Sequence, residues 1–122
     1  MPETICIVDD HLETREALVD ILTRQGYEVL PAANGSEFLE IINTKEIDLV
    51  LADLILPDFS GLELLKKCHE FDSDIQVIMV TGYGTVETAV EAMREGAFHY
   101  LAKPVKPAEL KALVRKALAL RQ

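Results

Sequence analysis

The sequence predicts one α/β domain in which a sheet of five parallel strands is covered by helices on both faces. Short β-branched runs alternate with longer segments of helical periodicity along the whole chain, and this alternation is typical of parallel βαβ units. Two of the short runs are apolar after their first residue, as expected for central strands buried on both faces. The length of 122 residues fits one domain whose core needs neither disulfides nor a structural metal.

Five short runs are predicted as strands. Those at 48–52 (DLVLA) and 76–80 (QVIMV) are too short for helices and rich in apolar residues, so they are predicted as central strands. The other three predicted strands cover 4–8, 27–32 and 98–101.

Turn and capping residues mark the first three helices. The first is expected over about 13–25, with Gly26 as its stop. The second has Ser36 as its expected N-cap and ends near Asn43. The third is expected over about 62–70, after a loop that contains several turn-forming residues.

The two remaining helices carry apolar residues at helical spacing. The fourth is expected between Thr85, its N-cap, and Gly96, its stop. Apolar residues fall at positions i, i+3, i+4 and i+7 of this helix: Val86, Ala89, Val90 and Met93. The fifth has Pro107 in its first turn and continues almost to Gln122.

The charge balance argues against nucleic-acid binding. The chain has 12 basic and 21 acidic residues, and the net charge of −9 repels a phosphate backbone. Apolar runs are too short to span a membrane and the N-terminus lacks a signal-peptide pattern, so we expect a cytoplasmic protein with no membrane partner. Cys6 and Cys68 lack metal-ligand or redox spacing and are predicted to be buried thiols.

Polar residues follow or end four of the predicted strands. They are Asp9 and Asp10 after the first, Asp53 after the third, Thr81 after the fourth and Lys103 after the fifth. Ligands of open parallel sheets bind beyond the carboxyl ends of the strands, so we expect these side chains to form one site. Each has an ordinary interpretation alone, such as an N-cap for Asp9, but their coincidence at four strand ends favours a function.

The predicted cluster fits phosphoryl transfer. Three carboxylates at one edge repel one another by roughly 3 kcal/mol per pair at about 5 Å, so they need a counter-charge and are expected to destabilise the metal-free fold. Oxygen ligands suit Mg²⁺, and Lys103 supplies a second positive charge. A carboxylate beside these cations is a competent nucleophile toward a phosphoryl group.

Four ordered motifs resemble those of the receiver domain of two-component response regulators. They are IVDD at 7–10, DLVLADLILPDFSGLELL at 48–65, VIMVTGYGTVETAVEAMREGAF at 77–98 and YLAKPV at 100–105. The resemblance covers essentially the whole chain, and it implies a flavodoxin-like (βα)5 fold with strand order 2-1-3-4-5 and a single receiver domain over 1–122.

The resemblance implies that Asp53 is phosphorylated, by the phosphohistidine of a sensor histidine kinase or phosphotransfer protein, or by a small donor such as acetyl phosphate. Asp10 and Asp53 would ligate Mg²⁺ together with the backbone carbonyl of Ile55, while Asp9 would hold the metal's water shell. Lys103 would pair with a phosphoryl oxygen. The chain would then be a signalling domain that promotes its own phosphorylation and dephosphorylation, rather than an enzyme.

The resemblance also implies a switch. The Thr81 hydroxyl would move onto the phosphoryl group, and Tyr100 would turn inward into the vacated space. This would change the face formed by helix four, strand five and helix five, which is expected to support a homodimer or to dock a fused effector. The peptide bond before Pro104 is expected to be cis.

One segment of the chain indicates a subfamily of receivers. The segment 82–98 looks like receivers joined to ATPase transcription activators that work with the nitrogen-type sigma factor, or to hybrid kinases. The chain fits either a stand-alone receiver or the N-terminal piece of a longer regulator.

Two bulky residues, Ile55 and Tyr83, flank the path of a water molecule that would attack the phosphoryl group. The sequence leaves the lifetime of that group open. His99 is interpreted as a surface histidine without a role.

Two other functions compete with this interpretation. A phosphatase of the haloacid dehalogenase type also uses an aspartate nucleophile with Mg²⁺, but it normally has a second aspartate two residues later, where this chain has Ile55. A flavodoxin-like flavin binder needs a hydroxyl-rich phosphate loop after the first strand, where the run Asp9-Asp10-His11 would repel the phosphate.

Overall fold

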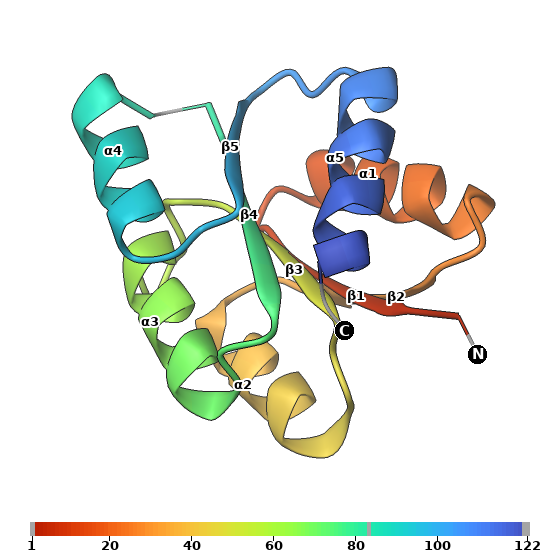
Figure 1. Cartoon of the computed structure of the whole chain (residues 1–122), viewed down its shortest axis with the longest axis horizontal. Helices are drawn as coiled ribbons and strands as arrows, with labels where there is room; N and C mark the ends of the chain where they lie inside the picture. The colour runs from red at the N-terminus through yellow and green to blue at the C-terminus, as the bar shows by residue number, and fades with distance from the viewer. Residues whose placement is uncertain (1, 83, 121–122) are drawn as a thin grey trace.

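The computed structural model describes residues 2–82 and 84–120 and contains one five-stranded parallel sheet (Figure 1). The strands are β1 (Thr4–Val8), β2 (Glu28–Ala32), β3 (Leu49–Ala52), β4 (Gln76–Thr81) and β5 (His99–Ala102). Their order across the sheet is β2-β1-β3-β4-β5, and every neighbouring pair is parallel. The predicted flavodoxin-like α/β class and strand order are confirmed, and the predicted strand bounds differ by one residue at most.

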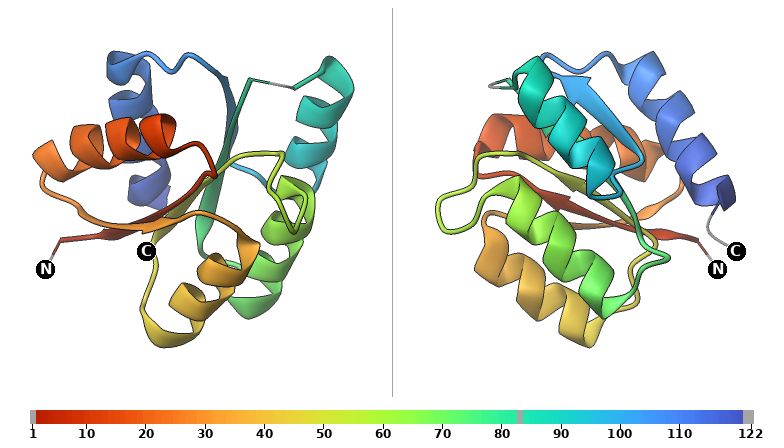
Figure 2. Two further views of the ribbon diagram at one scale, coloured as in Figure 1. Left: turned by 180° about the vertical axis from the view of Figure 1, so that it is seen from behind. Right: turned by 60° about the vertical axis from the view of Figure 1, so that its left-hand side comes forward.

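Helices cover both faces of the sheet. They are α1 (Leu12–Arg24), α2 (Gly35–Thr44), α3 (Gly61–Phe71), α4 (Val86–Arg94) and α5 (Pro107–Leu120). Helices α1 and α5 lie on one face, while α2, α3 and α4 lie on the other, as both views of Figure 2 show. This two-sided cover explains why the central strands are apolar on both faces.

The core consists of two apolar clusters, one on each side of the sheet. Alternate residues of β1 enter different clusters: Cys6 packs on the side of α2 and α3, and Ile7 packs on the side of α1 and α5. Both Cys6 and Cys68 are buried thiols, as predicted. Burial, together with the nearby Cys68, raises the pKa of Cys6 to about 12.

The register of the strands brings their carboxyl ends to one edge. Val8 of β1 is paired with Ala52 of β3, so the residues that follow them, Asp9 and Asp53, lie at the same level. On the far side of β4, the backbone N–H of Lys103 donates to the carbonyl of Thr81 at 3.0 Å. The predicted site residues therefore meet above β1, β3, β4 and β5.

The N-cap of α2 differs from the prediction. Asn34, not Ser36, is the N-cap, and its side chain accepts a hydrogen bond from the backbone N–H of Glu37 at 2.9 Å. Ser36 lies inside the first turn, where its hydroxyl instead donates to Asp58 at 2.9 Å. Both residue types cap helices well, so their order along the chain did not decide which one begins the helix.

The apolar stripe that helical spacing places on α4 faces solvent rather than the core. Val86 is 81% exposed, and Val90 and Met93 are also exposed, whereas Ala92 is fully buried. Ala92 is the residue through which the helix joins the buried cluster on this face of the sheet. The predicted ends of α4 are confirmed: the Thr85 side chain accepts from the backbone N–H of Thr88, and Gly96 has a positive φ of 100°.

No helix in the described part of the chain is long and apolar enough to cross a membrane.

Candidate functional site

Three buried polar side chains lie at the carboxyl edge of the sheet. Asp9 is 2% exposed, and Asp53 and Thr81 are each 1% exposed. Buried carboxylates require charged or hydrogen-bonding partners, because losing hydration otherwise costs several kcal/mol. All three residues were predicted to belong to one site, and the structure brings them together at this edge.

Lys103 provides the partner of both buried carboxylates. Its Nζ donates to Asp53 Oδ2 at 2.8 Å and lies 2.8 Å from Asp9 Oδ2. Burial by itself lowers the pKa of Lys103, but the hydrogen bonds and charges of Asp53 and Asp9 outweigh it and leave the pKa raised. The peptide bond between Lys103 and Pro104 is cis, as predicted. The amine therefore stays charged and bridges the ends of β1 and β3.

Asp10 and His11 complete an acidic cluster beside this bridge. One potential ligand atom from each of Asp9, Asp10, His11 and Asp53 lies within 4.8 Å of the others. The side chain of Asp10 is 39% exposed, so this carboxylate is the one that faces solvent. The oxygen donors and the net negative charge of the cluster fit a hard divalent cation such as Mg²⁺.

His11 was not predicted as a residue of the site. Its Nδ1 is 3.3 Å from Asp9 Oδ1 and 3.4 Å from Asp10 Oδ1. The signal in the sequence was its position directly after the aspartate pair at the end of β1, where the chain turns into α1. By contrast, His99 lies on β5 and its Nδ1 accepts from the backbone N–H of Tyr100, consistent with its interpretation as a surface histidine.

The loop after Asp53 is held at both ends. The backbone N–H of Ile55 donates to Asp53 Oδ1 at 3.1 Å, while the side chain of Ile55 is exposed. Further along, the Asp58 carboxylate accepts from the backbone N–H groups of Gly35 and Ser36 at 2.8 and 3.0 Å. The backbone hydrogen bond from Gly35 contributes most to lowering the pKa of Asp58. This contact fastens the loop to the start of α2, where the helix dipole favours an anion.

Tyr100 of β5 lies beside the carboxyl end of β4. Its hydroxyl is buried and has no hydrogen-bond partner among the described residues. A side chain at Gly84 would collide with this hydroxyl and would approach the Thr81 methyl at 3.1 Å. Tyr100 therefore occupies an inward position beside Thr81. Tyr83, predicted to flank the path of an attacking water, lies outside the described residues.

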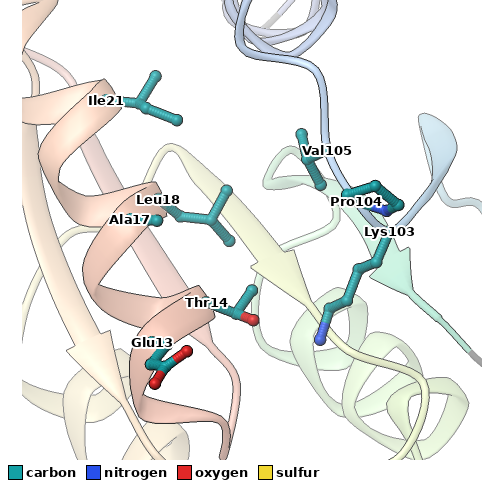
Figure 3. A pocket seen from close by; sticks show the side chains of 8 residues that line it. All are labelled: Glu13, Thr14, Ala17, Leu18, Ile21, Lys103, Pro104 and Val105. Carbon is teal, nitrogen blue, oxygen red and sulfur yellow. The ribbon is translucent and has the colours of Figure 1, made fainter.

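A groove adjoins the site between α1 and the segment after β5. It has a volume of about 490 Å³, and Figure 3 shows the α1 side chains facing Pro104 and Val105 across it. Its lining is mostly apolar but includes Lys103 at the end next to the buried carboxylates. An apolar groove that leads to a charged centre can receive the side of a partner helix.

Comparison with known proteins gives consistent matches along the chain. A family model described as the response regulator receiver domain matches residues 5–115. Sporulation initiation phosphotransferase F of Bacillus subtilis is 37% identical over 121 residues, which cover 99% of this chain and 98% of that protein. The transcriptional regulatory protein ZraR of Klebsiella oxytoca is 39% identical over 115 residues, which cover 94% of this chain but 26% of ZraR.

Solved structures agree with these matches. A CheY-like response regulator receiver domain protein from Methanospirillum hungatei superposes with a TM-score of 0.95 at 37% identity, covering 99% of this chain and 97% of the other. NtrX from Brucella abortus, in complex with ADP, has a TM-score of 0.92 at 33% identity. That match covers 98% of this chain but 27% of NtrX.

Proposed function

This chain belongs to the response regulator receiver domain family, and on that premise we propose that Asp53 is the side chain that accepts the phosphoryl group. Receivers are the phosphoacceptor domains of two-component signalling. The observation that carries the assignment is the buried ion pair: Asp53 is 1% exposed and its Oδ2 lies 2.8 Å from the Lys103 amine. A carboxylate held beside a fixed cation, at the end of a central strand, is arranged as a nucleophile.

The proposed reaction is a direct transfer. A carboxylate oxygen of Asp53 attacks the phosphorus of a phosphohistidine, the P–N bond breaks, and the imidazole leaves with the electron pair. The same attack on acetyl phosphate breaks a P–O bond and releases acetate. Lys103 then pairs with a phosphoryl oxygen, because its amine already lies at hydrogen-bond distance from the acceptor. The chain promotes its own phosphorylation, and its own dephosphorylation by water, through these groups.

Receiver domains generally bind Mg²⁺ at this acidic pocket, and the oxygen donors of the cluster fit that ion. We propose that Asp10 and Asp53 ligate it together with the backbone carbonyl of Ile55, and that Asp9 holds its water shell. When bound, the metal neutralises charge on the phosphoryl oxygens. The part of this chain is to hold the carboxylates at one edge and to keep Lys103 charged.

Labelling with acetyl phosphate and Mg²⁺, followed by intact mass, tests the acceptor. The wild-type chain should gain one phosphoryl group, and Asp53→Asn should remain unlabelled. Asp20→Asn removes an exposed carboxylate of α1 that pairs with Arg24, and should be labelled like the wild type. If Asp53→Asn gains phosphate as fast as the wild type, the assignment is wrong.

The phosphodonor protein is proposed to dock on the groove beside α1. The groove reaches from Ile21 of α1 to Val105 and ends at Lys103, so a helix seated there would bring a phosphohistidine toward Asp53. The partner is a sensor histidine kinase or a phosphotransfer protein, as for receiver domains generally.

The output is proposed to pass through α4, β5 and α5. When the Thr81 hydroxyl contacts the phosphoryl group, the inward place of Tyr100 is stabilised and α4 shifts its packing. The exposed apolar residues of that helix, Val86, Val90 and Met93, then become the contact surface of a homodimer or of an effector. Sedimentation with and without beryllium fluoride should show phosphoryl-dependent association that Tyr100→Ala abolishes. Association that is unchanged by the mimic would exclude this surface.

The relatives support a wider proposal. ZraR and NtrX are about four times as long as the matched region, so receivers of this kind also occur joined to other domains. We propose that residues 1–122 form one receiver domain that acts in the cytoplasm and controls transcription through such an effector. The receiver itself, with its net charge of −9, does not contact nucleic acid.

A further inference from the structure

The acidic cluster contains one donor that is not oxygen. The imidazole Nδ1 of His11 is 3.3 Å from Asp9 Oδ1 and 3.4 Å from Asp10 Oδ1. With Asp53, these residues place one ligand atom each within a span of 4.8 Å. An acidic site that also offers an imidazole differs in metal preference from one that offers oxygen donors alone.

The spacing of these atoms is close to that of a coordination sphere. In an octahedral site with metal–ligand distances near 2.1 Å, adjacent ligand atoms are about 3.0 Å apart and opposite ones about 4.2 Å apart. The distance of 3.4 Å from His11 Nδ1 to Oδ1 of Asp10, a proposed direct ligand, exceeds the adjacent value by only a few tenths of an ångström. The His11 side chain is 53% exposed, so its ring has room to close this difference.

Lys103 does not compete for the same carboxylate oxygens. Its amine lies at Oδ2 of both Asp9 and Asp53. Oδ1 of Asp9 instead accepts the backbone N–H of His11 at 2.9 Å and lies next to the imidazole. The two oxygens of Asp9 therefore face different partners, and the backbone contact keeps His11 beside the cluster.

We propose that His11 is a metal ligand that gives this site a preference for first-row transition dications over Mg²⁺. Imidazole binds Co²⁺, Ni²⁺ and Zn²⁺ far better than Mg²⁺, which selects oxygen donors. His11 ligates through the lone pair of Nδ1, and the ring then carries its proton on Nε2. The inference rests on the metal site of the proposed function and adds a specificity-determining residue to it.

The test compares two metals in matched variants. His11→Asn keeps an N–H near the position of Nδ1 that can donate to Asp9, but it removes the imidazole lone pair. We expect Co²⁺ affinity, measured by calorimetry, to fall by about tenfold or more and Mg²⁺ affinity to change by less than about twofold. His99→Gln removes an exposed imidazole outside the cluster and should change neither affinity. A ¹H–¹⁵N spectrum of each variant verifies that the fold is retained.

A direct readout comes from the ring nitrogens. In protein labelled with ¹⁵N-histidine, Zn²⁺ should shift the Nδ1 signal of His11, and Mg²⁺ should not. Equal losses of Co²⁺ and Mg²⁺ affinity in His11→Asn, or no loss of either affinity, would overturn the proposal. An Nδ1 chemical shift of His11 that does not change on addition of Zn²⁺ would also overturn it. If the wild type binds no Mg²⁺ while His11 still responds to Zn²⁺, the metal assignment of the proposed function fails and this inference stands.

Discussion

The hydroxyl of Tyr100 occupies the space in which a side chain at Gly84 would begin, so the inward position of the ring depends on a residue without a Cβ. The hydroxyl is buried without a hydrogen-bond partner among the described residues, a state that costs about 1–3 kcal/mol. Packing of the ring against the cluster on the α2–α4 side of the sheet offsets this cost. The position of Tyr100 is therefore set by shape and is sensitive to small changes at Gly84.

Gly84→Ala should force Tyr100 out of this position. The new methyl group would collide with the tyrosine hydroxyl, so the ring must turn away toward solvent. Aromatic spectra of ¹³C-tyrosine-labelled protein should move the Tyr100 signals to exposed values, while Asp53 is still labelled by acetyl phosphate. Gly82→Ala is the matched control, because its Cβ would meet nothing closer than Lys103 at 3.8 Å. Unchanged Tyr100 signals in Gly84→Ala would contradict this account.

Lys103→Met should destabilise the metal-free fold by about 3 kcal/mol, because it leaves Asp9 and Asp53 buried without their counter-charge. Urea unfolding measures the loss. Added Mg²⁺ should restore part of the stability, since the metal supplies a replacement charge. The exposed Lys106 is the control position, and Lys106→Met should unfold within about 0.5 kcal/mol of the wild type. Equal midpoints for the two variants would show that the buried pair contributes nothing net.

Asp10→Asn should raise the stability of the metal-free protein by less than about 1 kcal/mol and weaken Mg²⁺ binding. Asp10 repels Asp9 and Asp53 but is not held by Lys103, and its partial exposure screens the repulsion. The electrostatic repulsion among the three carboxylates is thus weaker than the sequence predicted, because Lys103 already neutralises the buried carboxylates of Asp9 and Asp53. Asp9→Asn should have the opposite sign. A loss of stability in both variants would exclude net repulsion at Asp10.

Cys6→Val should make the free energy of unfolding less dependent on pH at alkaline pH. Burial raises the pKa of Cys6 from 9.0 to about 12, so above pH 9 the unfolded chain releases a proton that the folded chain retains. Stability that is present below pH 9 is therefore lost as the pH rises toward 12, by about 1.4 kcal/mol per pH unit. The slope of unfolding free energy against pH in that window should be smaller in the variant. Parallel curves would show that Cys6 does not control this loss.

Much of the fold and site follows from local signals in the sequence. The apolar runs of β3 and β4 are buried on both faces, and each strand bound differs from its prediction by one residue at most. Asp9, Asp53, Thr81 and Lys103 follow or end strands, so a parallel sheet brings them to one edge whatever the helices do. These predictions succeed because strand length, residue type and chain order are local properties.

What the tertiary structure decided concerns how surfaces fit. Helical spacing shows that α4 has an apolar stripe, but not that Ala92 is the residue buried in the core while Val90 stays exposed. The contact of Asp58 with Gly35 joins residues 23 positions apart, and it decides that Ser36 donates to Asp58 while Asn34 caps α2. Rotation of a helix and closure of a loop depend on partners far along the chain, and only the packed structure brings those partners together.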